Sequence, residues 1–444
     1  MSRALCLFLF LAPSVAVTAE PIVFEGVHVV PMDRETLLEE MTVVVEDGLI
    51  TAFGKSDRVS VPPDSRRIEA RGQFLLPGLV EMHVHLRARD NVELYLTHGF
   101  TTVRDMNGRL GDTLTWRDEV RAGTLMGPRI VAGGVTLYQG APEDHPYPVR
   151  TPDEARRAVR DMVARGYDLI KVYRLDREPF LALMDEARRL SIPVAGHHPD
   201  VVHDQSYEAP LDISMEDVLT SGMVSLEHLD ELVNVGLRMK LDPDAIAPLA
   251  RKLRAGNVAV TTILGQDFMV QRVRREEDAY LNEEREREIR TLFGEEGVAT
   301  ARQQIERIGT DLPRNIEDLG AAIPEFSLLM LRRFHEEGVE LLIGTDSHGP
   351  LLPAGRSGLD EMDLFVEAGL RPYDALRAAT VNAARVLGAL DRRGTVAVGK
   401  EADLLLVEGN PLESLASLRR PLGVMVMGRY YDRTQLRTVI SPSQ

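Results

Sequence analysis

Cysteine is almost absent from this chain of 444 residues. Cys6 is the only one, and it precedes the first apolar run. A lipid-attachment cysteine should follow such a run, so the sequence does not indicate a lipoprotein. If residues 1–19 are removed, no cysteine remains. The mature protein then needs no disulfide and tolerates an oxidising compartment.

Positive charge is also in short supply. The sequence has 52 basic against 69 acidic residues, which gives a formal net charge of −17. Nucleic-acid binding requires a basic surface for the phosphates, so nucleic acid is excluded as a main partner. High net charge of one sign is otherwise typical of a soluble protein.

Long apolar runs are missing outside residues 1–19, MSRALCLFLFLAPSVAVTA. That segment has one charge, Arg3, then an apolar run, then small residues at Val17 to Ala19. This pattern predicts a secretory signal peptide that is cleaved after Ala19, and therefore a periplasmic or secreted protein with no stable membrane insertion. A retained N-terminal anchor is the alternative.

Both ends of the remaining chain are rich in β-strand patterns. Residues 20–75 and 389–444 contain short apolar strands separated by glycine turns, such as MTVVVEDGLITAFG and GTVAVGKEADLLLVEG. We expect these two parts to form one small β-sandwich domain.

The middle of the chain, residues 76–388, alternates short apolar strands with helical patterns. Eight such units predict an α/β fold of the (β/α)₈ TIM-barrel class. The first strand is FLLPGLVEMHVH, and the others are FTTVRD, PRIVAGG, DLIKVY, IPVAGHH, MVSLEHL, VAVTTILG and ELLIGTD. Thr151 before the helical stretch PDEARRAVRDMVAR suits N-terminal capping.

The interval between the seventh and eighth strands is too long for one helix. Residues 266–325, approximately, contain a charged sequence with a helical pattern, REEDAYLNEEREREIRTLFGEEG. We interpret this segment as a helical cap over the barrel mouth. The alternative is a pair of solvated surface helices with no role in the activity.

Histidine and aspartate gather at the strand ends. His83 and His85 are two residues apart on one strand, so they face the same side. Active sites of such barrels lie at the carboxyl ends of the strands, where Lys171, His197, His228 and Asp346 also occur. An isolated His-x-His is usually structural, but placement at several strand ends indicates joint binding of a divalent metal.

These motifs together resemble the metal-dependent amidohydrolase superfamily. The similarity rests on PGLVEMHVH, the strand-four lysine, Gly-His, Glu-His, Gly-Thr-Asp and the tail ALRAATVNAARVLG followed by GTVAVGKEADLLLV. Within it, the sequence is most similar to the imidazolonepropionase-like branch, which includes metal-dependent Xaa-Pro dipeptidases (prolidases). The resemblance implies two divalent ions, expected to be Zn²⁺. The metal ligands it implies are His83, His85, Lys171, His197, His228 and Asp346.

The resemblance assigns a different part to each ligand. His83, His85 and Asp346 would hold the more buried ion, and His197 and His228 the second. Lys171 would bridge both ions as a carbamate, because an ammonium cannot ligate a cation and carboxylation makes it an anionic oxygen ligand. A strand-end lysine paired with a carboxylate is the simpler alternative. We expect His198 and Glu227 to face away from the site, since adjacent strand residues alternate.

The implied chemistry is hydrolysis of an amide or related C–N bond in a small molecule or short peptide. Water activated by the two ions attacks the carbonyl carbon, and Asp346 is the catalytic residue that passes the proton to the leaving nitrogen. A dipeptidase or prolidase-like activity is the first expectation. Opening of a lactam or imidazolone-type ring, or hydrolysis of an N-acyl amino acid or an ester-like xenobiotic, is the alternative. An inactive metal-binding scaffold is a remote third possibility.

The substrate contacts are less determined by the sequence. The loop after the third strand lacks the Gly-Gly-His triplet that related proteins often carry, and Tyr138 and His145 are candidates to replace it. Tyr173 and His348 lie two residues after Lys171 and Asp346, respectively, and are further candidates. Association into a homo-oligomer is expected only by analogy with the family.

Overall fold

The computed structural model describes most of the chain after the predicted signal peptide. The described ranges are residues 20–108, 110–141, 145–200, 211–276, 280–310, 317–347 and 349–440. The predicted signal segment and the substrate candidate His348 lie outside them. Within the described part, no helix has both the length and the apolar character that a membrane span requires.

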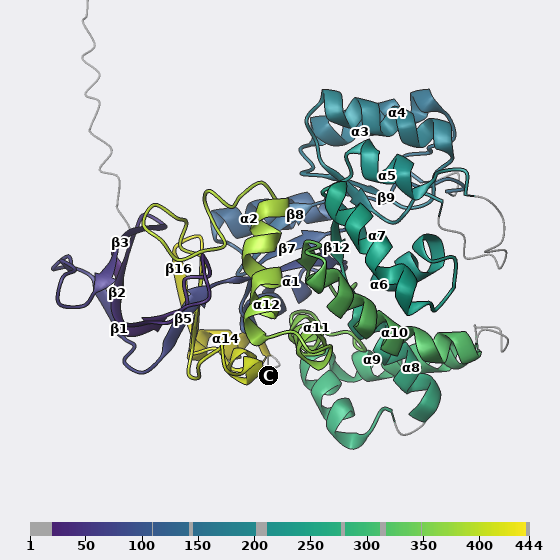
Figure 1. The fold of residues 1–444 in the computed structure, drawn as a ribbon. Coiled ribbons are helices and arrows are strands. Elements are labelled where there is room, and N and C mark those ends of the chain that lie inside the picture. Colours follow the sequence, from purple (N-terminus) through teal and green to yellow (C-terminus); the bar gives the residue numbers. More distant parts are fainter. Residues whose placement is uncertain are drawn as a thin grey trace, which may run out of the picture.

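The two ends of the chain combine in one mixed sheet, at the left of Figure 1. Its strands run in the order β16-β15-β14-β5-β1-β2-β3, with β4 paired to β1. The bounds are β1 Ile22–Val29, β2 Leu38–Glu46, β3 Leu49–Lys55, β4 Arg66–Glu69, β5 Phe74–Pro77, β14 Leu404–Val407, β15 Gly423–Val426 and β16 Arg429–Asp432.

The expected sandwich of two sheets is therefore found as one continuous hydrogen-bonded sheet of eight strands. Strand β1 explains the continuity, because it pairs with β4 through Ile22–Glu25 and with β5 through His28–Val29. Register shifts between Phe24 and Val29 interrupt the regular pairing of β1, so β1 pairs with β4 before them and with β5 after them. The buried side chains of this sheet form their own core, which includes Phe24, Val43, Leu75, Leu404 and Met425.

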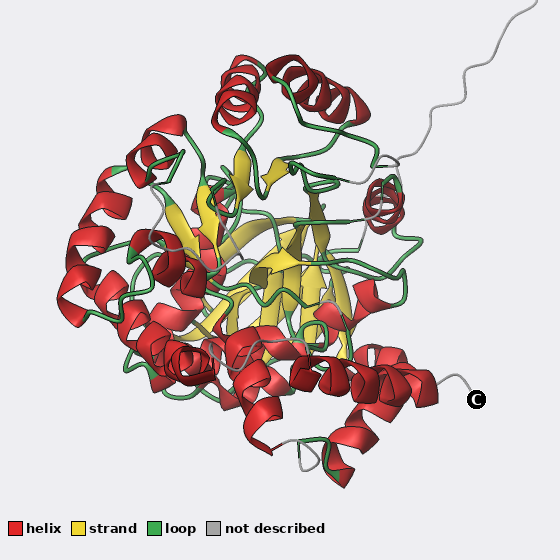
Figure 2. Cartoon of the chain, turned by 90° about the vertical axis from the view of Figure 1, so that its right-hand side faces the viewer, coloured by secondary structure: helices red, strands yellow, loops and turns green. Residues whose placement is uncertain are grey.

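The strands expected for the barrel form the centre of the larger body, with helices around them (Figure 2). They make two parallel sheets, β6-β7-β8 and β13-β12-β11-β10-β9. Their bounds are β6 Leu79–Val84, β7 Phe100–Asp105, β8 Arg129–Ala132, β9 Ile170–Val172, β10 Val194–Gly196, β11 Ser225–Glu227, β12 Ala259–Thr261 and β13 Leu341–Leu342. The first expected strand is thus split, since β5 belongs to the terminal sheet and β6 to the body.

The eight body strands do not close into one continuous barrel ladder. At one gap, Met82 N donates to Ile343 O at 2.7 Å, and His85 N donates to Ser347 O at 3.0 Å. At the other, Leu137 N donates to Lys171 O at 2.9 Å. Positive φ angles at Asp346 (56°) and Gly134 (65°) interrupt the extended backbone beside these gaps. Hydrogen bonds still join the two sheets, although regular pairing is lost.

Helices follow most body strands and cover their outer side (Figure 2). Thr151 caps α3 as expected, since its hydroxyl accepts a bond from Glu154 N at 3.3 Å. The helices up to the seventh strand are α1 Asn91–Thr97, α2 Asp112–Ala122, α3 Pro152–Arg165, α4 Arg177–Arg189, α5 Met215–Ser221, α6 Leu229–Glu231, the π-helical turn Leu232–Gly236 and α7 Pro243–Ala255.

The long interval before β13 is helical, as the sequence indicates. It contains α8 Leu264–Glu276, α9 Glu283–Thr310 and α10 Glu317–Glu336, which lie together at the lower right of Figure 1. Helix α9 changes direction at Gly294, whose φ is 66°. The remaining helices are α11 Arg356–Glu367, α12 Pro372–Arg377, the π-helical turn Ala378–Asn382, α13 Ala383–Val386, the short 3₁₀ helix Leu415–Arg419 and α14 Arg433–Ile440.

Candidate metal centre

Three of the predicted ligands meet at the ends of β6 and β13. The ligand atoms of His83, His85 and Asp346 all lie within 4.8 Å of one another, and they form a metal-binding group. His85 Nε2 is 2.6 Å from Asp346 Oδ1, and His83 Nε2 is 3.6 Å from the same oxygen. The structure thus brings together side chains from opposite ends of the body's sequence.

The protonation states of this group suit a cation. Burial, with the nearby Lys171 charge, holds the pKa of His83 well below its ordinary value, so its imidazole is neutral. Burial opposes ionisation of Asp346, but the contact with His85 outweighs it and holds the pKa of Asp346 well below its usual range. Neutral imidazoles and a carboxylate are the donor set that divalent zinc and related ions accept.

The other two predicted histidines lie against this group. The rings of His197 and His228 stack with centroids 4.7 Å apart. The His228 ring is 5.1 Å from that of His83, and the His197 ring is 6.5 Å from it. His198 instead accepts a bond from Asp200 N at 3.2 Å, away from this stack, and burial lowers its pKa to about 4.

Lys171 lies near this arrangement, since its charge lowers the pKa of both His83 and His228. Its side chain is buried, and its Nζ has no hydrogen-bond partner among the described residues. Burial lowers the pKa of Lys171 to about 8, although the carboxylates of Glu227, Asp346 and Glu231 favour the charged form. A buried amine without a partner does not fit the simple alternative of a lysine–carboxylate pair. It fits a lysine that becomes a metal ligand after carboxylation, so the residues present suit the implied ions.

Unusual backbone conformations position two of the ligands. His228 has φ 66° and Asp346 has φ 56°, in a region that residues other than glycine rarely adopt. Gly344 allows the close approach of two strands, because a Cβ there would lie 2.4 Å from Thr261 Cγ2 and 2.8 Å from His83 Cβ. Strain of this kind is typical of functional sites.

The expectation that Glu227 faces away from the site is wrong. Its Oε2 is 2.9 Å from His83 Nδ1, and Arg104 Nη2 donates to its Oε1 at 2.7 Å. The positive φ of His228 breaks the strand alternation, so both neighbours point inward. Burial would raise the pKa of Glu227, but Arg104 and His83 hold it below its ordinary value.

Glu231 is a second carboxylate near the metal-binding group, and the sequence did not predict it. Glu231, on α6, contacts His197 Nδ1 through Oε1, and its Oε2 is buried without a hydrogen-bond partner. Burial, with the nearby charge of Asp230, raises the pKa of Glu231 well above its ordinary value. The only sequence signal was the position of Glu231 one helical turn after His228.

The substrate candidates are placed differently from one another. Tyr173 reaches the centre, since its ring is edge-on to His197 with centroids 4.5 Å apart. The rings of Tyr138 and His145 pack edge to face in the loop after β8, with their centroids 5.2 Å apart.

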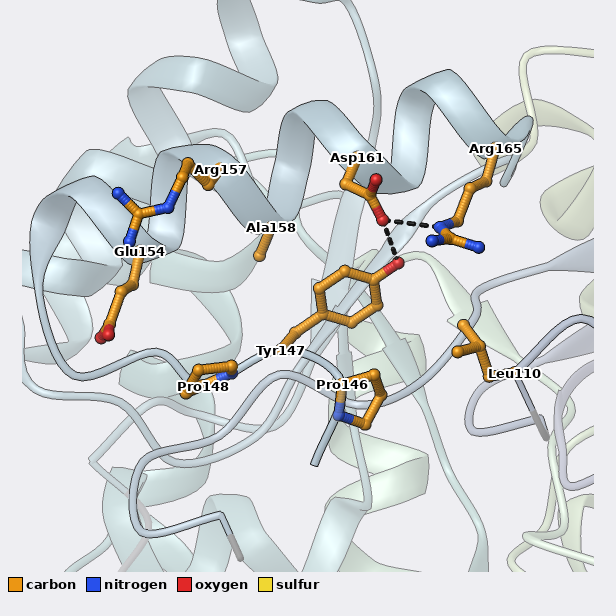
Figure 3. A pocket seen from close by; sticks show the side chains of 9 residues that line it. All are labelled: Leu110, Pro146, Tyr147, Pro148, Glu154, Arg157, Ala158, Asp161 and Arg165. Carbon is orange, nitrogen blue, oxygen red and sulfur yellow. Dashed lines mark hydrogen bonds and ion pairs between the residues drawn. The ribbon is translucent and has the colours of Figure 1, made fainter. Parts of the chain in front are cut away.

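The same loop is fixed to helix α3 on the outside of the body. Figure 3 shows the Tyr147 hydroxyl pointing at Asp161, which it contacts at 2.5 Å, while Arg165 donates to the same carboxylate at 2.6 Å. These residues line a hollow of about 350 Å³ that contains none of the predicted metal ligands.

Comparison with known proteins agrees with the motifs. Residues 74–430 match the Amidohydrolase family. The chain belongs to this family and is a hydrolase that acts on carbon–nitrogen bonds. The resemblance stated from the strand-end motifs is thereby confirmed.

Individual relatives differ in what they act on. The chain is 24% identical to an imidazolonepropionase from Symbiobacterium thermophilum, over 82% of this chain and 83% of the relative. It is 22% identical to an ochratoxinase from Aspergillus niger, over 91% and 84% of the two chains. The structure of a candidate prolidase from Bifidobacterium longum is similar with a TM-score of 0.71 and 25% identity, over 95% and 98% of the chains.

Proposed function

We propose that this protein hydrolyses the amide bond of small substrates with a free amino group, such as dipeptides, using two divalent metal ions. The observation that carries the proposal is the convergence of His83, His85 and Asp346 beside the buried Lys171 amine. His197 and His228 supply a second pair of imidazoles within ring contact of His83. One chain thus offers donors for two ions rather than one.

In this proposal, His83, His85 and Asp346 hold one ion and His197 and His228 hold the other. Lys171, carboxylated on Nζ, would supply a further anionic oxygen ligand. Divalent ions bound there would lower the pKa of a water molecule and polarise the scissile carbonyl. The ions would be Zn²⁺ by the nature of the nitrogen and oxygen donors.

The protein's own groups move the proton and maintain the geometry. Asp346, ionised by its histidine neighbours, accepts the proton of the attacking water at a carboxylate oxygen and returns it to the leaving nitrogen. Glu227 accepts a bond from His83 Nδ1, which leaves Nε2 as the metal-binding nitrogen. The Arg104 guanidinium keeps Glu227 ionised and fixed in place.

Three carboxyl groups support a substrate with a positive charge. Asp230 Oδ1, Glu231 Oε2 and Asp267 Oδ2 are buried and have no hydrogen-bond partner in the described structure. Burial raises the pKa of Asp267, and so do the neighbouring carboxyl groups of Asp230, Glu361 and Glu231, so ionisation of Asp267 is disfavoured. An ammonium group nearby would favour the ionised form. A dipeptide with a free amino terminus provides it, whereas an N-acyl amino acid or a lactam does not.

The names of the relatives leave a second substrate class open. A cyclic amide is the alternative, because imidazolonepropionases are among the relatives. The first proposal includes export to the periplasm or the medium, which we expect from residues 1–19. An exported enzyme meets short peptides as substrates rather than intermediates of cytoplasmic metabolism.

A substrate panel on zinc-loaded enzyme tests the proposal. The panel contains Xaa-Pro dipeptides, the same dipeptides with an acetylated amino terminus, and lactams. We expect turnover of the free dipeptides and a loss of at least tenfold in kcat/KM on acetylation. Turnover of lactams without turnover of dipeptides would refute the dipeptidase assignment. Equal kcat/KM values for free and acetylated dipeptides would show that the three carboxyl groups do not bind the amino group of the substrate.

A further inference from the structure

A second cavity lies at the opposite end of the body strands from the metal ligands. It has a volume of about 470 Å³. Its wall includes Arg129, the first residue of β8, and Leu169, Pro193 and Val224, which come directly before β9, β10 and β11. His197 and His228 come just after the other ends of β10 and β11, and the lining contains none of the predicted metal ligands. Arg104 is the lining residue that also contacts Glu227, the partner of His83.

Arginine dominates the charged lining of this cavity. Six arginines line it, namely Arg104, Arg117, Arg121, Arg129, Arg392 and Arg393. Only two lining residues are acidic, Asp168 and Glu401. Carboxylates outside the lining also pair with these arginines: Glu227 with Arg104, Asp118 with Arg121, Asp403 with Arg129 and Asp391 with Arg392.

One of these guanidinium groups has a buried nitrogen without an acceptor, and a second has its nearest ion-pair partner at a long distance. Arg117 is only 9% exposed, and its Nη1 donates to Gly166 O at 2.8 Å and to Asp168 Oδ2 at 3.1 Å. Its Nε has no hydrogen-bond partner among the described residues, with Asp118 Oδ1 3.6 Å away. Arg393 is largely buried and lies 3.8 Å from Glu401 Oε2. That oxygen already has Arg129 Nη2 at 2.7 Å. A buried donor without an acceptor is costly and indicates a missing partner.

The rest of the lining shows what kind of partner fits. Guanidinium groups bind carboxylate and phosphate oxygens in a forked geometry. Apolar side chains, including Val120, Ile130 and Leu387, complete the wall. The cavity is larger than a bare inorganic anion requires, so there is room for an organic portion against the apolar side.

We propose that this cavity binds a small organic molecule through a phosphate or carboxylate group, held by Arg117 and Arg393. The exposed Arg121 and Arg392 lie at its edge and attract the anion. The site is not the hydrolytic site, and it does not depend on the identity of the hydrolysed substrate.

Calorimetry and thermal unfolding of the full-length, metal-loaded protein test this proposal. The probes are glycerol 3-phosphate, citrate and inorganic phosphate, each compared with chloride at equal ionic strength. We expect saturable binding and a rise of several degrees in Tm with at least one organic anion. A larger response to glycerol 3-phosphate than to citrate identifies phosphate as the group recognised, and the reverse identifies carboxylate. Absence of saturable binding by both would overturn the proposal.

Variants distinguish this site from other anion sites. Arg393→Gln and Arg117→Gln should each weaken binding at least tenfold. Arg251→Gln, a matched change at an exposed arginine paired with Glu337, should leave it unchanged. The Arg393 side chain is 19% exposed, against 10% for Arg117, so its variant is the safer test if Arg117→Gln fails to fold. Asp346→Asn should bind the anion as the wild type does, and loss of binding there would assign the anion to the metal centre instead. Equal affinity in wild type and Arg393→Gln would also refute the site.

Discussion

Arg104 Nη2 lies 2.7 Å from Glu227 Oε1, and both side chains are almost completely buried inside the body strands. The other oxygen of Glu227 is 2.9 Å from His83 Nδ1. Arg104 also donates to Met82 O at 2.6 Å and to Ser225 Oγ at 3.0 Å. This arrangement ties β7 to β6 and β11 and fixes the tautomer of a metal ligand.

Removal of the guanidinium should destabilise the protein strongly. Arg104→Met leaves Glu227 buried without its cation, so we expect the free energy of unfolding to fall by about 3–5 kcal/mol. Urea unfolding measures it. The double variant Arg104→Met/Glu227→Leu should regain most of that stability, because no buried charge remains, but its metal affinity should fall about 10–100-fold as His83 loses its partner. Wild-type metal affinity in the double variant would show that Glu227 does not orient His83.

Lys171 should be needed for activity through a carboxylate rather than through its positive charge. We expect Lys171→Ala to lose activity, with partial recovery on addition of a short carboxylic acid that replaces the carbamate. Activity assays and metal analysis with and without acetate or propionate measure this. Lys252→Ala, on the exposed side of α7, is the control and should behave as the wild type. Full activity of Lys171→Ala without additive would disprove the bridge.

Glu361 should make the stability of the metal-free protein depend on pH. Burial raises its pKa to about 7, although Thr262, Leu264 N and Gly265 N donate to it. The folded state therefore binds a proton more tightly than the unfolded state. This stabilisation is fully present below pH about 4.5 and is lost as pH rises to about 7, by about 3 kcal/mol. Urea unfolding at several pH values measures the slope, which Glu361→Gln should flatten. An unchanged slope in this variant would assign the pH dependence to other groups.

The helical segment between β12 and β13 should select substrates by size. Glu288 of α9 contacts Arg356 at the start of α11, and Gln304 lies beside Gly349, just beyond the Asp346 segment. Replacement of residues 280–310 by a short Gly/Ser linker should raise kcat/KM for long peptides relative to dipeptides by fivefold or more. Metal content should stay the same, because the predicted ligands lie elsewhere. An unchanged ratio would favour surface helices without such a role.

The sequence predicted what depends on local patterns. Each expected body strand contains an observed strand, because short apolar runs between helical periods are distinctive. His83, His85 and Asp346 could be named in advance because strand ends converge at one edge of such a fold.

What the sequence did not reveal depends on distant partners and on backbone torsions. Glu227 and Arg104 are separated by 123 positions, and no local pattern pairs them. Ser225 and Glu227 face Arg104 from the same side of β11, and the left-handed backbone of His228 is what strand alternation does not anticipate. The incomplete barrel ladder arises in the same way, from the positive φ of Asp346 and Gly134.

The central position of β5 in the terminal sheet has a consequence for synthesis on the ribosome. One edge of β5 pairs with β1, which is made first, but the other pairs with β14, which is made near the end. Until β14 emerges, the nascent chain presents an open strand edge immediately before the segment that carries His83, and such edges recruit other chains. Translation that stops before residue 404 should therefore yield aggregates or substrates for proteolysis rather than a soluble apo-enzyme.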